Sequence, residues 1–172
     1  MTTALLVAVG LLAALTVFNL IVVLGVVRRL RSYEERLGGM AEPAPVLSTH
    51  LGARVADFAA STMDDRPVSR AALTGTTLFG FFSPDCSACH ERLGDFRATA
   101  ARHPGDAYAV VVRDGGDIPT VLTALAGTPV ILEDPEGPVA TAFGVRGFPA
   151  FVLVDDEGLV ESSGYQVPVL VP

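Results

Sequence analysis

The two cysteines of this chain, Cys86 and Cys89, are separated by only two residues. At this spacing the two sulfur atoms lie within reach of each other across one helical turn, which is the geometry that a reversible disulfide needs. The chain has no further cysteine, so it has no framework of structural disulfides. The pair therefore predicts redox chemistry by thiol–disulfide exchange.

The same residues allow a second chemistry, because the segment from Cys86 to His90 has the C-x-x-C-H pattern of covalent haem attachment. In that case His90 would ligate the haem iron. The candidates for the opposite iron ligand are His50, His103, Met40 and Met63. The strands and helices predicted around the motif favour the dithiol, since a small haem domain does not need them. A Soret absorption band would identify the haem form.

Strand and helix signals place the cysteine pair at a junction. Residues 78–82 form a short, aromatic-rich apolar run typical of a buried strand, and Pro84 ends it. The sequence from about Cys86 onward predicts a helix, with a stop signal at residues 103–105. Unpaired N–H groups and the helix macrodipole stabilise a thiolate at a helix N-terminus. Cys86 is therefore predicted to be the more exposed thiol and the one with the lower pKa.

The segments after this helix alternate between strands and helices. Strands are predicted at residues 107–112, 129–132, 151–154 and 159–161, and helices at residues 118–126 and 138–143. The last two strands are joined by an Asp-Asp-Glu-Gly turn, and a further strand or hairpin is predicted within residues 54–69. This alternation predicts an α/β fold with a mixed sheet flanked by helices.

An uncharged segment at residues 4–27 is long enough to cross the hydrocarbon core of a membrane as a helix. We therefore predict a single transmembrane anchor with a basic extension over residues 1–37, a linker over residues 38–51 and a domain over residues 52–172. Taken alone, the positive-inside rule places this domain in the cytoplasm. The basic residues that follow the span are Arg28, Arg29, Arg31 and Arg36.

A second motif lies in residues 145–155, where Pro149 directly precedes an apolar strand. Together with the pair Cys86 and Cys89, this motif resembles the thioredoxin superfamily, in which the residue matching Pro149 is a cis-proline packed against the dithiol. Residues 52–165 resemble the membrane-tethered TlpA/redoxin group of thiol–disulfide oxidoreductases. The anchor with its basic stretch further resembles the MauD proteins.

The resemblance implies that Cys86, as a thiolate, attacks a partner disulfide and that Cys89 then displaces the reduced partner. Pro149 and its flanking backbone would form the edge on which a partner peptide docks. The implied partners are protein thiols or disulfides and an upstream redox donor. We expect no cofactor and no metal, and the net charge of −7 with a pI near 4.8 argues against nucleic acid. The resemblance also favours an extracytoplasmic domain, which is the location we expect despite the arginines.

The chain departs from the family pattern at four places. Asp85 stands where a tryptophan precedes the first cysteine, and no proline lies between the two cysteines. A carboxylate beside Cys86 is expected to raise the pKa of its thiol. Gly80 occupies the position of a buried acid, and no C-terminal helix is predicted before Pro172. The apolar tail after residue 165 contains two prolines, so we expect it to be extended and either to cover part of a sheet face or to meet a partner.

Three further interpretations remain open. Ser83 and Cys86 have a peroxiredoxin-like spacing, although Phe79 stands where a proline is expected. Zinc binding by two cysteines and a histidine is a generic possibility, because the histidines do not have zinc-finger spacing. The non-enzymatic alternative is a redox-inactive module that uses a thioredoxin fold to dock a membrane partner. A Cys86→Ser variant separates the two classes, since only the enzyme loses its function.

Overall fold

The computed structural model describes residues 15–16, 19 and 51–168. The predicted membrane anchor and the predicted linker fall almost entirely outside these ranges. Within the described ranges, no helix combines the length and the hydropathy that a membrane span requires. The anchor, the linker and the boundaries between them therefore stay predictions.

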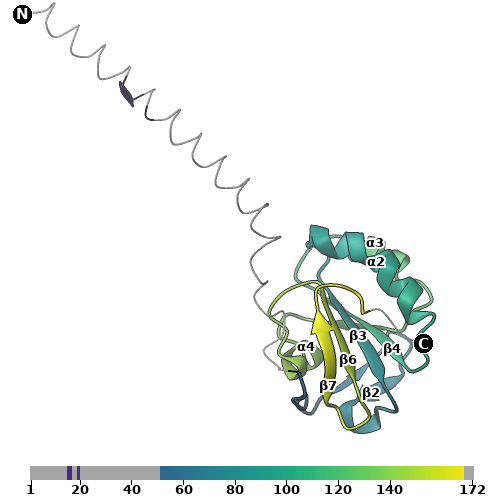
Figure 1. The fold of residues 1–172 in the computed structure, drawn as a ribbon. Coiled ribbons are helices and arrows are strands. Elements are labelled where there is room, and N and C mark those ends of the chain that lie inside the picture. The colour runs from purple at the N-terminus through teal and green to yellow at the C-terminus, as the bar shows by residue number, and fades with distance from the viewer. Residues whose placement is uncertain (1–14, 17–18, 20–50, 169–172) are drawn as a thin grey trace, which may run out of the picture. The chain divides into compact units, whose positions relative to one another are not determined.

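A mixed five-stranded sheet forms the centre of the domain, in the order β5-β4-β3-β6-β7 (Figure 1). Its parallel half consists of β3 (Thr77–Phe82), β4 (Ala107–Val112) and β5 (Val130–Glu133). Its antiparallel half consists of β6 (Ala150–Val154), which pairs with β3, and β7 (Val160–Gly164), which pairs with β6. The predicted α/β fold with a mixed sheet is confirmed.

Three helices and a small hairpin surround the sheet: α2 (Ser87–Ala100), α3 (Ile118–Ala124), α4 (Pro138–Phe143), β1 (Ala59–Ser61) and β2 (Pro67–Ser69). The helices α2 and α3 cover one face, and α4 with the β1–β2 hairpin covers the other (Figure 1). A short 3-10 helix, η1 (Arg70–Ala72), leads from the hairpin toward β3. The sheet is therefore enclosed on both faces, as its apolar strands require.

The two cores lie on either side of β3, all of whose residues are buried. Phe79 packs toward α4, where its ring centroid lies 4.7 Å from that of Phe143. Phe82 packs toward α2, where its ring centroid lies 5.2 Å from that of Phe96. Burying such a side chain stabilises the folded state by roughly 2–3 kcal/mol. The central strand thus anchors the turn that follows it, which carries the cysteines.

The predicted element bounds agree with the structure to within one to three residues. The predicted helix at residues 118–126 stops at Ala124, and the last strand continues beyond residue 161 to Gly164. This Ser-rich continuation has no apolar alternation, and its pairing with β6 makes it a strand. The strand predicted at residues 129–132 lies one position later. In the tail, Val167 packs against the core on the α2 side, which agrees with the expected covering of a sheet face.

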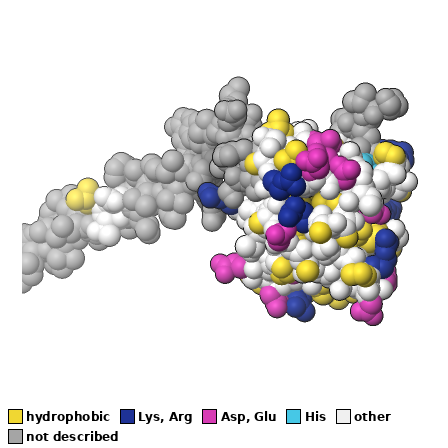
Figure 2. All heavy atoms as spheres, turned by 90° about the horizontal axis from the view of Figure 1, so that it is seen from below, with side chains coloured by type: hydrophobic (Ala, Val, Ile, Leu, Met, Phe, Trp, Pro, Cys, Tyr) yellow, Lys and Arg dark blue, Asp and Glu magenta, His cyan; other side chains and the backbone are white. Residues whose placement is uncertain are grey.

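Basic, acidic and apolar side chains are interspersed on the face that Figure 2 shows. Several arginines of the domain are engaged in ion pairs, among them Arg54 with Glu157 at 3.1 Å and Arg113 with Asp134 at 2.9 Å. Exposed pairs of this kind contribute about 1 kcal/mol or less each. The interspersed charges on the face in Figure 2 do not form a continuous basic surface of the type that nucleic acids require.

Candidate active site

Cys86 and Cys89 are joined by a disulfide at the junction between β3 and α2. Their Cα atoms are 5.2 Å apart. Cys86 is the N-cap residue of α2, and its sulfur accepts a hydrogen bond of 3.2 Å from the backbone N–H of Cys89. In the reduced protein this N–H can stabilise the thiolate of Cys86, because a hydrogen bond to the charged form favours that form. The strand–turn–helix placement predicted from the sequence is confirmed.

The two cysteines differ in their access to solvent. Cys86 is half-buried, whereas Cys89 is only 1% exposed. This difference in exposure agrees with the prediction that Cys86 is the more exposed of the two cysteines. A partner sulfur can therefore approach Cys86 directly, while Cys89 is positioned to react with Cys86.

Aromatic rings fill the space beneath the dithiol. Phe82, Phe96 and Phe151 pack together with ring centroids 5.2–5.8 Å apart, and Cys89 belongs to the same apolar cluster. At Gly80, where the resemblance places a buried acid, a Cβ atom would lie 2.5 Å from the ring of Phe96. The phenyl ring thus occupies the room that an acidic side chain would need, and the floor beneath Cys89 is apolar.

The loop that ends at Pro149 lies against the dithiol. The Phe148–Pro149 peptide bond is cis, as the resemblance predicted. The backbone carbonyl oxygen of Phe148 lies 3.5 Å from the Sγ of Cys86. Pro149 itself is buried and leads directly into β6. The structure therefore brings Cys86, Cys89 and Pro149 together, while their catalytic roles stay predictions.

A second loop, residues 113–117, contacts the turn before the cysteines from the side of β4. The hydroxyl of Ser83, which is 3% exposed, donates a hydrogen bond of 2.8 Å to Oδ1 of Asp114. Gly116 has a φ of 69°, and a Cβ atom there would lie 2.6 Å from the carbonyl carbon of Pro84. This close approach requires glycine. Residues 113–117 are recognisable in the sequence as a charged, Gly-rich loop after a buried strand, but their place beside the cysteines was not predicted.

Glu133, the last residue of β5, is a buried carboxylate that the sequence analysis also missed. It is 6% exposed, and it accepts hydrogen bonds from the backbone N–H groups of Val139 at 3.0 Å and Ala140 at 2.8 Å. Burial raises the pKa of this carboxyl, although the bonds from Ala140 and Val139 act in the opposite direction. The only feature of the sequence that could have indicated a buried acid here is the position of Glu133 between an apolar strand and a helix that begins with a proline.

The two histidines of the described domain do not support the haem alternative. Nε2 of His90 lies 2.8 Å from the carbonyl oxygen of Pro84, and Nε2 of His103 lies 2.8 Å from that of Thr76. Covalent haem attachment would form a thioether at Cys89. The edge of the porphyrin would then have to lie beside a sulfur that apolar side chains enclose. The geometry therefore favours the dithiol. In the part of the chain that the structure describes, no cluster of three His, Cys, Asp or Glu side chains is arranged to hold a metal ion.

A groove of about 580 Å³ adjoins the dithiol, because Phe148 and Asp114 are among the residues that line it. Val112, Ala140 and Val145 contribute apolar surface to its walls. The groove lies beside α4, since Ala140 and Thr141 of this helix are among its lining residues. It therefore extends the surface that a partner bound at Cys86 would meet.

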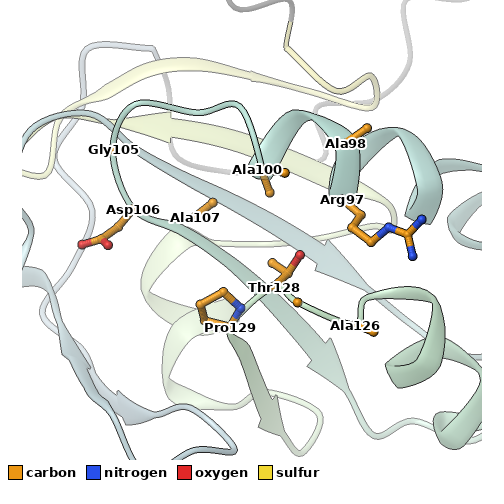
Figure 3. Close-up of a pocket in the computed structure, with 11 residues that line it drawn as sticks. Arg97, Ala98, Ala100, Gly105, Asp106, Ala107, Ala126, Thr128 and Pro129 are labelled. Carbon is orange, nitrogen blue, oxygen red and sulfur yellow. The ribbon is translucent and has the colours of Figure 1, made fainter.

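A second cavity, of about 420 Å³, lies at the opposite end of the sheet. Figure 3 shows the short side chains of Ala100, Ala107 and Ala126 around it, with Arg97 extending from α2 and Asp106 at the start of β4. No cysteine or histidine lines it, and the carboxylate of Asp106 is only half-buried. The chemistry of the domain is therefore concentrated at the dithiol end.

The parallel β3–β4–β5 unit, the antiparallel β6–β7 unit, the cysteine pair at the start of α2 and the cis-proline before β6 define the thioredoxin fold. Comparison with solved structures confirms this class of fold. The thioredoxin domain of a thiol–disulfide oxidoreductase from Bacteroides vulgatus superposes with a TM-score of 0.59 and 20% identity, covering 69% of this chain and 91% of that chain.

Two further solved structures have the same fold. A thio-disulfide isomerase from Thermus thermophilus has a TM-score of 0.57 and 22% identity, covering 70% of this chain and 89% of that chain. A secreted disulfide oxidoreductase from Mycobacterium tuberculosis has a TM-score of 0.53 and 19% identity, covering 67% of this chain and 87% of that chain. The sequence matches no protein-family model and no curated protein.

Proposed function

We propose that this protein is a thiol–disulfide oxidoreductase that exchanges the Cys86–Cys89 disulfide with protein thiols. The observation that carries the proposal is the placement of the disulfide. Its accessible sulfur caps α2 and lies 3.5 Å from the Phe148 carbonyl, and its second sulfur is buried behind the first. The similar solved structures named above, which include oxidoreductases and an isomerase of disulfides, support this assignment.

The reaction proceeds by two displacements that balance in sulfur bonds and electrons. In the reduced protein, the Cys86 thiolate attacks one sulfur of a partner disulfide, which forms a mixed disulfide and releases the first partner thiolate. The Cys89 thiolate then attacks the Sγ of Cys86, which closes the intramolecular disulfide and releases the second partner thiolate. Two electrons pass to the partner, and its two thiolates take up protons from solvent. A dithiol donor protein resets the cycle by the reverse steps.

The docking edge in this proposal is the backbone at Phe148 and Pro149. An extended partner segment that lies along this edge would bring its sulfur to Cys86, with its neighbouring side chains toward the groove beside α4. Phe148 contacts Cys86 through its carbonyl oxygen and is also one of the residues that line the groove, so the accessible sulfur and the groove are neighbours. This arrangement favours a protein or peptide partner over a small thiol.

We further propose that the domain is tethered to a membrane by residues 4–27 and faces the extracytoplasmic side, as in TlpA-like and MauD-like proteins. The support is the uncharged run of 24 residues in the sequence and the similarity to a secreted oxidoreductase. A Ser48→Cys substitution in a chain without Cys86 and Cys89 tests this location. A membrane-impermeant maleimide is expected to label it in whole cells. Labelling only after lysis would place the domain in the cytoplasm.

A trapping experiment tests the proposed exchange. The Cys89→Ser variant, reduced and mixed with a disulfide-bonded peptide, is expected to accumulate a mixed disulfide through Cys86, because no second thiol can release the peptide. The Cys86→Ser variant serves as the control and is expected to form none, since its remaining thiol is buried. Equal trapping by both variants, or trapping by neither, would contradict the proposal.

A further inference from the structure

We propose that Glu133 is a positioning residue for exchange at Cys86, because it ties together the two loops that flank the dithiol. These loops are residues 113–117 and residues 145–149. The proposal rests on the proposed thiol–disulfide exchange and names a residue that acts on it without touching the reacting sulfurs.

The carboxylate of Glu133 connects to the loop at residues 145–149 through α4. Its Oε1 accepts the N–H of Ala140 at 2.8 Å, and the carbonyl oxygen of Ala140 accepts the N–H of Val145 at 2.9 Å. Three residues later, the carbonyl of Phe148 lies 3.5 Å from the Sγ of Cys86. A short series of hydrogen bonds and contacts thus leads from the buried acid to the reactive sulfur.

The backbone of Glu133 connects to the other loop. Its carbonyl oxygen accepts the N–H of Arg113 at 2.8 Å, where residues 113–117 begin. In that loop Asp114 accepts the hydroxyl of Ser83, which lies in the turn leading to Cys86. One residue at the end of β5 therefore holds both sides of the dithiol, one through its main chain and one through its side chain.

The helix that Glu133 holds is too short to keep its place unaided. The α4 helix has six residues, and isolated helices of this length do not form in water. Its N-cap residue is Gly137, which makes no side-chain capping bond, and a Cβ atom there would lie 2.5 Å from Cδ of Glu133. The carboxylate thus takes the place of a cap, and the glycine provides the room for it. Removing the carboxylate leaves two buried N–H groups without an acceptor.

This arrangement predicts two functional consequences of loosening α4. A partner segment docked along residues 145–149 would lose its alignment with Cys86, and a displacement of about 1 Å can cost a factor of ten to a hundred in rate. The carbonyl oxygen of Phe148 would also retreat from Cys86. Because a carbonyl oxygen opposes negative charge on a nearby sulfur, its retreat is expected to lower the pKa of the Cys86 thiol.

The test compares Glu133→Ala with the control Val160→Ala. Val160 is 1% exposed in the core cluster on the α4 side but lies on β7, away from both loops. Two readouts are measured on the full chain: the rate of exchange with a disulfide-bonded peptide, and the pH profile of iodoacetamide alkylation at Cys86. Both variants are expected to have a lowered urea midpoint. Only Glu133→Ala is expected to lose about tenfold in exchange rate and to shift its alkylation profile downward by about half a pH unit.

A second variant keeps the test decisive if Glu133→Ala does not fold. Glu133→Gln retains one acceptor oxygen but turns an amide donor toward the second N–H. It is therefore expected to slow exchange by about threefold and to shift the alkylation profile downward by less than Glu133→Ala does. If the folded variants lose stability but match Val160→Ala in both readouts, Glu133 is a structural residue only and the inference is wrong. The pH profile of alkylation at Cys86 does not depend on exchange activity. It therefore tests the positioning role of Glu133 even if the wild type shows no exchange.

Discussion

The two ends of the sheet both bring loops into close contact but hold them together differently. At the dithiol end Gly116 lies against the carbonyl carbon of Pro84, and at the opposite end Gly105 lies against the carbonyl oxygen of Thr76. At the dithiol end carboxylates accept the side-chain bonds between segments, Asp114 from Ser83 and Glu133 from the N–H groups of α4. The opposite end has a cavity with small side chains and a histidine bonded to the Thr76 carbonyl.

This difference indicates which features serve the fold and which serve the site. Close backbone approach at a glycine is needed wherever a loop must pass over its neighbour, so it occurs at both ends. Both ends have a side-chain bond between loops, but at the dithiol end the bonds to Asp114 and Glu133 connect the segments on either side of Cys86. We therefore expect substitutions at the two ends to have similar effects on stability and different effects on exchange.

The largest expected effect is the loss of exchange in Cys86→Ser. Without this sulfur no mixed disulfide can form, so the rate of exchange with a peptide disulfide is expected to fall to that of the uncatalysed mixture. The matched substitution at the opposite end is His103→Ala, whose partner is the Thr76 carbonyl. It is expected to leave the exchange rate within about twofold of the wild type. Comparable losses in both variants would remove the distinction between the ends.

The two close-contact glycines provide a sharper comparison. Gly116→Ala and Gly105→Ala are each expected to lower the free energy of unfolding by roughly 1–3 kcal/mol, because a Cβ atom would overlap neighbouring backbone. Urea denaturation measures this effect. Only Gly116→Ala is expected also to slow exchange per folded molecule, since it displaces the turn that carries Cys86. Slower exchange in Gly105→Ala would show that the ends are mechanically coupled.

The bond between Ser83 and Asp114 is expected to contribute about 1 kcal/mol to stability. A double-mutant cycle with Ser83→Ala and Asp114→Ala measures this coupling by urea denaturation at neutral pH. The pair is part-buried with a 2.8 Å separation, so its interaction is not fully screened by solvent. Strictly additive effects of the two substitutions would mean that the bond does not hold the loop.

The smallest expected effect is a pH dependence of stability from Glu133. Burial raises the pKa of this carboxyl above its ordinary value of 4.5. The contribution of the Glu133 carboxyl to the free energy of unfolding is therefore fully present below pH 4.5. It is lost as the pH rises through the pKa that the carboxyl has in the folded protein. Relative to Glu133→Gln, the wild type is expected to lose stability between about pH 4.5 and the folded pKa.

Asp117 provides a control of opposite sign. Its hydrogen bonds from Thr120 lower the pKa of its exposed carboxyl below the ordinary value of 3.8. The contribution of the Asp117 carboxylate to the free energy of unfolding is therefore present above pH 3.8. It is lost as the pH falls through the pKa that the carboxyl has in the folded protein. Relative to Asp117→Asn, the wild type is expected to gain stability as the pH rises. Urea midpoints across the acid range measure both slopes, and slopes of the same sign would contradict the assignment.

The sequence predicted the elements that local signals define. The strand Ala107–Val112 is a continuous apolar run, and the helix Pro138–Phe143 starts at a proline and ends before Gly144, whose φ is 62°. Both agree with the predicted bounds. The cysteine pair and Pro149 were found because each belongs to a contiguous motif.

The parts of the site that the sequence did not predict depend on strand pairing. Ser83 and Asp114 are 31 positions apart, and they meet because β3 and β4 are parallel neighbours. The carboxylate of Glu133 meets α4 because of how the chain turns after β5, and an acid at a strand end is otherwise typical of a solvated loop. Phe96 fills the space above Gly80 through packing of α2 on the sheet, which no spacing rule specifies.

The most direct test of the central claim is a redox titration of Cys86 and Cys89 in the full chain. The protein is equilibrated in buffers of reduced and oxidised glutathione, its free thiols are alkylated after acid quenching, and the products are resolved by mass. We expect molecules with both thiols free to convert to molecules with neither, along a two-electron curve with a tenfold change in the ratio per about 30 mV. Two cysteines that are alkylated independently, or a disulfide that does not respond to the buffer, would contradict the account.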